Sequence, residues 1–234
     1  MNHQELASLF IFFYNKLFGV LNLVIKKILM DAEKRWLSID GPEFIAKIGI
    51  SAGHTVVDFG CGDGYYTFPA ARVVKDEGRV YALDNDDVTV QKIKRKAAEG
   101  LFKNIIPLLV PADLSLGLDQ EIADAALLYD VLHYLQKIER KNVYAQLQRL
   151  LKYEGLLSVY PKHYKSDSPM WSLADMSLQN IIKEITEMGF RFENKRYEKL
   201  FHFHSYTSGY ILSFKKLLPG NPGTAISSRE IQTE

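Results

Sequence analysis

The stretch VVDFGCGDGYYTFPAA, Val56–Ala71, places three glycines within five residues, directly after an apolar run. The run predicts a buried strand, and the residues from Thr67 onward predict a helix. Glycines in the turn between them allow positive φ angles and let a ligand approach the backbone closely. The helix that follows presents free N–H groups and the positive end of its dipole. The stretch therefore predicts a ligand-binding loop at the carboxyl end of a strand, where open α/β sheets bind their ligands.

The rest of the chain repeats this alternation of strand and helix. We expect strands at His54–Phe59, Arg79–Asp84, Ile105–Val110, Ala123–Tyr129 and Leu156–Tyr160, and helices at Thr67–Lys75, Val88–Glu99, Arg140–Lys152 and Ser177–Met188. Two further runs, Phe190–Glu198 and Phe203–Lys215, follow each other closely and predict an antiparallel hairpin. The sequence thus predicts an α/β fold with a Rossmann-like, doubly wound, seven-stranded sheet, mostly parallel with an antiparallel C-terminal edge hairpin.

The composition is typical of a globular protein without a strong charge bias. The 234 residues include 29 Lys and Arg against 28 Asp and Glu, a balance that disfavours nucleic acid as a partner. Cys61 is the only cysteine, which excludes an internal disulfide and indicates a cytoplasmic, reducing location. His202 and His204 alternate along a predicted strand, but they lack a third ligand, and we expect no metal.

Residues 1–35 are unusually apolar and predict an amphipathic helix with a narrow polar stripe. Its charged interruptions leave no apolar stretch long enough to span a membrane. The wide apolar face could lie on a membrane surface, on a second copy in a homodimer, or on the protein's own sheet. We expect peripheral membrane contact through residues 9–30. Residues 36–215 would form the main domain, and residues 216–234, rich in Pro, Gly and Ser, a disordered tail.

The spacing of the glycines separates this loop from other nucleotide-binding loops. The dinucleotide fingerprint G-x-G-x-x-G, begun at Gly60, would need a glycine where Tyr65 stands, and the Gly-Lys-Ser/Thr ending of a P-loop is absent. The pattern DFGCGDG, with an acid two residues before the first glycine, resembles motif I of the class I S-adenosylmethionine-dependent methyltransferases. Over residues 36–215 the chain is similar to the methyltransferase type 11 and ubiquinone/menaquinone C-methyltransferase group.

The resemblance implies S-adenosylmethionine as the cofactor and a set of residues that contact it. These are Asp58, Gly60, Gly62, Gly64, Asp84, Asn85, Ala112, Asp113 and Tyr129. Motif I implies contacts to the amino-acid end of the cofactor, and Asp84 in GRVYALDNDD implies hydrogen bonds to its ribose hydroxyls. LVPADLS implies contacts to the adenine, and ALLYDVLHYL resembles the segment that closes the fourth strand. Tyr153 and Glu154 replace the Pro-Gly of the common L-x-x-x-L-K-P-G-G turn.

Methyl transfer from a sulfonium is an in-line displacement, which requires chiefly that the acceptor be positioned and water excluded. Catalytic candidates therefore lie on the loops after the fourth and fifth strands: His163, His133 and Tyr160. His133 could instead cap or pack against the next helix. We expect a methyltransferase acting on a small-molecule, hydrophobic acceptor. The alternatives are a non-catalytic cofactor-binding or membrane-associated scaffold protein, and a protein or RNA methyltransferase.

Overall fold

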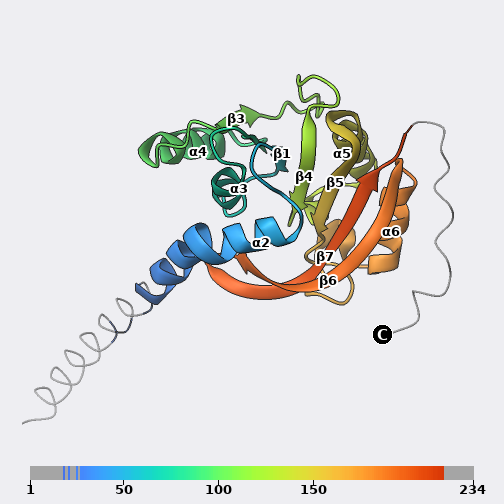
Figure 1. Cartoon of the computed structure of the whole chain (residues 1–234). Helices are drawn as coiled ribbons and strands as arrows, with labels where there is room; N and C mark the ends of the chain where they lie inside the picture. The colour runs from blue at the N-terminus through green and yellow to red at the C-terminus, as the bar shows by residue number, and fades with distance from the viewer. Residues whose placement is uncertain (1–17, 19–20, 22–24, 26, 219–234) are drawn as a thin grey trace, which may run out of the picture.

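A seven-stranded sheet with the order β3-β2-β1-β4-β5-β7-β6 forms the centre of the molecule (Figure 1). The computed structural model describes residues 18, 21, 25 and 27–218. The strands are β1 (Thr55–Phe59), β2 (Arg79–Asp84), β3 (Ile105–Leu109), β4 (Ala123–Tyr129), β5 (Leu151–Tyr160), β6 (Phe190–His202) and β7 (Ser205–Lys216). Strands β1 to β5 pair in parallel, and β7 runs antiparallel to β5 and β6. The predicted fold class is confirmed.

Helices cover both faces of the sheet because the parallel strands carry apolar side chains on both sides. Val56 and Val57 of β1 are both fully buried, in separate apolar clusters on opposite faces. One cluster includes side chains of α2 (Gly41–Lys47), α3 (Thr67–Val74) and α4 (Asp87–Glu99), and the other includes those of α5 (Lys137–Leu150) and α6 (Leu178–Thr186). This double covering leaves the carboxyl edge of the parallel strands, with its loops, open for a site.

Most element boundaries agree with the prediction to within a few residues, and the exceptions have local causes. Helix α5 begins at Lys137, three residues before the predicted start, because the Glu139 carboxylate accepts the Gln136 backbone N–H at 2.6 Å and caps the first turn. Strand β5 begins at Leu151 rather than at Leu156, and its bend contains Glu154 with φ of 57°. The predicted Ser177 cap of α6 is present, with its Oγ 3.2 Å from the Asn180 N–H.

The C-terminal hairpin is longer than predicted, and its turn lies elsewhere. His202 pairs with Ser205, so the turn consists of Phe203 and His204, both with positive φ (44° and 60°), as a type I′ turn requires. The expectation that His202 and His204 share one face of a strand is therefore wrong, because the chain reverses between them. The hairpin reaches from α6 to the N-terminal helices (Figure 1), where Phe201 stacks on Trp36 with ring centroids 5.8 Å apart.

The N-terminal segment is described only in part. Residues 27–35 are helical and continue into a π-helical turn, η1 (Trp36–Asp40), and then into α2. Most of the predicted apolar helix, and the predicted tail from residue 219 onward, lie outside the described residues. None of the helices in the described part of the chain has the length and apolarity that crossing a bilayer requires.

Candidate functional site

A cavity of about 530 Å³ opens at the carboxyl edge of the sheet, between the glycine loop after β1, the ends of β2, β4 and β5, and the tip of the β6–β7 hairpin. This volume is within the range of small-molecule sites. Six of the predicted site residues line the cavity: Gly60, Gly62, Asp84, Asn85, Tyr129 and Tyr160. Half of the twelve predicted site residues therefore lie in the wall of one cavity.

The glycine loop is held by backbone hydrogen bonds that leave one side of it open. The N–H groups of Gly60 and Cys61 donate to the Leu83 carbonyl at 2.8 and 2.9 Å. Gly60 has φ of 74°, and a Cβ there would lie 2.3 Å from a methyl carbon of Val131. Gly62 has φ of 49°, and a Cβ there would meet no atom within 4 Å. Gly60 is therefore required for packing, whereas Gly62 leaves its backbone accessible from the cavity.

Asp84 ends β2 with its carboxylate beside this loop. Its Oδ2 accepts the Gly62 N–H at 2.9 Å, and its Oδ1 accepts the Asp86 N–H at 3.1 Å. Each carboxylate oxygen accepts up to two hydrogen bonds, so both retain acceptor capacity. Asn85 lies next to it, and Val110 and Leu114 add an apolar wall. The edge thus combines a fixed carboxylate with an apolar surface, an arrangement suited to a ribose and a flat ring.

Two residues of the glycine motif lie behind the loop rather than in the cavity wall. Asp58 is 3% exposed and accepts a hydrogen bond from Thr67 Oγ1 at 2.5 Å. Burial raises the pKa of Asp58 to about 7. The hydrogen bond from Thr67 lowers this pKa, and the negative charge of Asp84 raises it further. A Cβ at Gly64 would lie 2.6 Å from the Phe68 ring, so this glycine allows α3 to pack closely. The cofactor contacts expected of Asp58 and Gly64 stay predictions.

The predicted adenine contacts after β3 are exposed. Asp113 accepts hydrogen bonds from the Ser115 N–H and Oγ at 3.0 and 2.7 Å, and neither Ala112 nor Asp113 is among the residues that line the cavity. Their neighbour Leu114, with φ of 60°, lines it instead. Tyr129, by contrast, lines the cavity as predicted, and its Oη lies 2.7 Å from Ser158 Oγ.

The catalytic candidates His133 and His163 come together around an acid that the sequence analysis passed over. Asp130 Oδ1 lies 3.6 Å from His133 Nδ1 and 3.8 Å from His163 Nε2. Asp130 Oδ2 lies 2.5 Å from Nε2 of His202 at the end of β6. Asp130 and His202 line the cavity, and the other two histidines lie behind them. Asp130 precedes His133 by three residues in YDVLH, a spacing that could have drawn attention to it; His202 had no comparable signal.

The two predicted histidines differ in their surroundings. Burial lowers the pKa of His133 to about 4, against the charge of Asp130, so this imidazole is neutral near neutral pH. His163 Nδ1 lies 2.9 Å from the Ser168 carbonyl oxygen. Because a carbonyl only accepts, Nδ1 carries a proton, and Nε2 is the ring nitrogen that faces Asp130. The third catalytic candidate, Tyr160, is buried, and burial raises the pKa of its hydroxyl well above its ordinary value, so the hydroxyl stays protonated near neutral pH.

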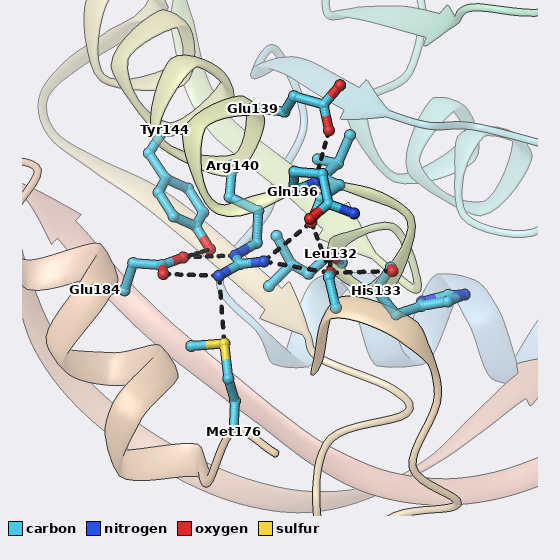
Figure 2. A network of polar contacts seen from close by, with 10 residues as sticks. Leu132, His133, Gln136, Glu139, Arg140, Tyr144, Met176 and Glu184 are labelled. Carbon is cyan, nitrogen blue, oxygen red and sulfur yellow. Dashed lines mark hydrogen bonds and ion pairs between the residues drawn. The ribbon is translucent and has the colours of Figure 1, made fainter. Parts of the chain in front are cut away.

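A buried ion pair fixes the segment that carries His133 (Figure 2). Arg140 of α5 binds Glu184 of α6 through two hydrogen bonds of 2.7 and 2.9 Å, and a third joins its guanidinium to the Leu135 carbonyl at 2.9 Å. Ser172 Oγ donates to the carbonyls of His133 and Leu135, at 3.1 and 2.6 Å. The backbone at His133 and after it is therefore held by Ser172 and by Arg140 of α5.

The tip of the β6–β7 hairpin closes the cavity from the side of the glycine loop. Tyr66 Oη donates to the Phe201 carbonyl at 3.2 Å, and Tyr65 Oη lies 2.6 Å from His204 Nδ1. These contacts join residues about 136 positions apart in sequence, of which Tyr65, Tyr66 and Phe201 line the cavity. Periodicity along the chain could not indicate this pairing.

Comparison with known proteins gives one family and several similar structures. Residues 56–155 match the family model described as a methyltransferase domain. A probable cobalt-precorrin-6B C(15)-methyltransferase (decarboxylating) from Saccharolobus solfataricus is 35% identical over 63 residues, 26% of this chain and 32% of that protein. The chain thus matches about a third of the length of this curated relative.

Two solved structures share most of the fold. A SAM-dependent methyltransferase from Aquifex aeolicus superposes with a TM-score of 0.62 at 21% identity, over 79% of this chain and 93% of that one. The cyclase SpnF superposes with a TM-score of 0.59 at 18% identity, over 76% of this chain and 80% of that one. At these identities the likeness concerns the fold.

Proposed function

We propose, from the match of residues 56–155 to a methyltransferase domain, that this chain is a class I S-adenosylmethionine-dependent methyltransferase and that it transfers a methyl group from S-adenosylmethionine to a small, apolar acceptor. The observation that carries the proposal is a single cavity that extends from the open backbone at Gly62 and the Asp84 carboxylate to the aromatic side chains of Tyr129 and Tyr160 at the ends of β4 and β5. A fold shared with the cyclase SpnF leaves the reaction open; the matched methyltransferase domain favours methyl transfer.

The residues at the cavity fit this cofactor in charge and shape. The free acceptor sites on Asp84 would hold the ribose hydroxyls, and the backbone around Gly62 would receive the amino-acid end. Val110 and Leu114 would lie against the adenine. When bound, the cofactor supplies an electrophilic methyl group, whose bond to sulfur breaks as a bond to the acceptor forms. The chain itself has to orient the two partners and exclude water.

An apolar, aromatic acceptor is favoured by the side chains at the mouth of the cavity. Tyr134 and Phe203 line it and are exposed, and the exposed Trp171 packs on Tyr134 with ring centroids 4.9 Å apart. Exposed aromatic side chains grouped at an opening are typical of sites for apolar ligands. No strongly basic surface adjoins the mouth among the described lining residues, which disfavours RNA as the acceptor.

The function is tested with purified protein, S-adenosylmethionine carrying a labelled methyl group, and a small-molecule extract. We expect S-adenosylhomocysteine to form and the label to appear in an organic-soluble product, and both to fail in the Asp84→Ala variant. The matched control is Asp87→Ala, which removes an exposed carboxylate outside the cavity. Cofactor affinity without turnover would favour a non-catalytic cofactor-binding protein. Label that appears in protein or RNA would favour a protein or RNA methyltransferase.

We also propose that the N-terminal helix contacts a membrane surface. Within the helical residues 27–35, Ile28, Leu29 and Met30 are exposed although they are large and apolar. An interfacial helix buries such side chains at the headgroup boundary. We expect the Ile28→Lys/Met30→Lys variant to lose co-sedimentation with anionic phospholipid vesicles, whereas Val88→Lys, at an exposed apolar residue of α4, retains it. Lipid-independent self-association that the double variant abolishes would favour a homodimer instead.

A further inference from the structure

Three side chains converge at the floor of the cavity with atoms that can donate electron pairs. Asp130 follows β4, His133 lies in the short helix η2 (Leu132–Tyr134), and His163 follows β5. One carboxylate oxygen and one nitrogen from each ring all lie within 4.8 Å of one another. Donor atoms around a tetrahedral zinc ion, with bonds of about 2.0–2.1 Å, are roughly 3.3 Å apart. The observed 3.6 and 3.8 Å from Asp130 Oδ1 to the two imidazoles need only small side-chain movements to reach this spacing.

Two of these donor atoms are buried without a hydrogen-bond partner. They are Asp130 Oδ1 and His133 Nδ1, and the His133 side chain is only 2% exposed. A buried polar atom left unpaired costs about 1–3 kcal/mol, and more when it is charged. His163 donates its Nδ1 proton to the Ser168 carbonyl, which leaves its Nε2 as the ring nitrogen available to a ligand in the same space. A cation bound here would accept electron pairs from the two unpaired atoms and from this nitrogen.

We propose that Asp130, His133 and His163 bind a divalent transition-metal ion of the zinc type. Two imidazoles and one carboxylate are a ligand set that such ions accept, with a remaining position open to water or substrate. Mg²⁺ and Ca²⁺ prefer oxygen ligands and would bind weakly here. The expectation of no metal rested on the absence of a third ligand beside His202 and His204; the ligands come instead from two other loops.

The surroundings hold the ligands in the way that a metal site needs. Asp130 and His163 both have positive φ, 58° and 68°, a strained backbone that persists only where the neighbouring structure imposes it. The Ser168 carbonyl sets the tautomer and the ring orientation of His163. The Arg140–Ser172 network anchors the backbone of His133 (Figure 2), and His202 orients the second oxygen of Asp130.

The position of the site relates it to the proposed acceptor. Asp130 and His202 line the cavity while His133 and His163 lie behind them, so the open position of the ion would face the cavity. There it would bind an oxygen of the acceptor and lower the pKa of a hydroxyl group, as zinc does for water. This step rests on the proposed function and identifies the acceptor as a compound with a hydroxyl next to its apolar part. Binding of the metal itself does not depend on it.

The site is tested by adding Co²⁺ and Zn²⁺ to full-length protein that has been treated with a chelator. We expect one ion per chain, visible absorption typical of four- or five-coordinate Co²⁺, displacement by Zn²⁺, and no displacement by excess Mg²⁺. His133→Gln and His163→Gln should each weaken binding by at least about tenfold. His204→Gln, which removes an exposed imidazole of the hairpin turn that does not line the cavity, should leave binding unchanged.

Folding and cofactor binding are measured in parallel, by circular dichroism and by calorimetry with S-adenosylmethionine. Because His133 is buried, Asp130→Asn serves as a further variant should His133→Gln fail to fold. Metal affinity that is unchanged in the ligand variants, or weakened equally by His204→Gln, would overturn the proposal. Stoichiometric Co²⁺ binding by a protein without affinity for S-adenosylmethionine would support the metal site and refute the proposed function.

Discussion

Replacement of Asp58 by Asn tests whether the acid of the glycine motif is neutral in the folded protein. Its pKa of about 7 lies above the ordinary value of 3.8. Between these values the folded chain retains a proton that the unfolded chain releases, so stability is lost as the pH rises through this window. At about 1.4 kcal/mol for each pH unit, the loss is on the order of 4 kcal/mol. Asn is neutral throughout and keeps an oxygen for the Thr67 hydroxyl, so the variant should gain stability relative to wild type as the pH rises from about 4 to about 7.

The assay is urea denaturation of wild type and variant, without cofactor, at several pH values in this range. Asp124→Asn is the matched control on the same sheet. Burial by itself would raise the pKa of Asp124. Hydrogen bonds from Lys152 and from the Thr55 N–H outweigh it, so that the pKa lies below its ordinary value. Its carboxylate therefore stabilises the fold above its unfolded pKa, and this variant should lose most stability at neutral pH. If the difference in unfolding free energy between wild type and Asp58→Asn does not change with pH while Asp124→Asn is destabilised at neutral pH, Asp58 is not neutral in the fold.

Three further changes test the site and its support. Asp84→Ala should weaken S-adenosylmethionine binding by roughly 1–3 kcal/mol, because ribose hydroxyls would lose buried acceptors; calorimetry measures this, and unchanged affinity would contradict the assignment. Gly60→Ala should destabilise the loop by about 1–3 kcal/mol, since φ is 74° and the new Cβ would lie 2.3 Å from a valine methyl carbon; an unaltered melting temperature would show that the loop relaxes freely. Arg140→Met should cost about 3–5 kcal/mol by leaving the buried Glu184 unpaired, and Arg140→Met/Glu184→Met should recover most of it in denaturant titrations. Equal losses in the single and double variants would refute the unpaired-charge explanation.

The features that depend on residues near one another in the chain could be predicted from the sequence. Alternating apolar runs and helical patterns specify a doubly wound sheet, because each strand and its following helix can bury their apolar faces in only a few ways. The glycine loop and Asp84 follow directly, since both lie at the ends of predicted strands. Their closeness, including the hydrogen bond from Gly62 to Asp84, results from the parallel pairing of β1 with β2.

The sequence by itself thus determined the fold and the loops at the carboxyl edge of the sheet that line the cavity. Only the tertiary structure decided that Asp58 faces the core, that the hairpin turns at Phe203 and His204, and that Asp130 stands among three imidazoles. These features come from contacts between residues far apart in the chain, and no local pattern records such contacts. The pairing of distant strands decides which side chains are buried and which charged groups come into contact. That pairing depends on packing across the whole sheet.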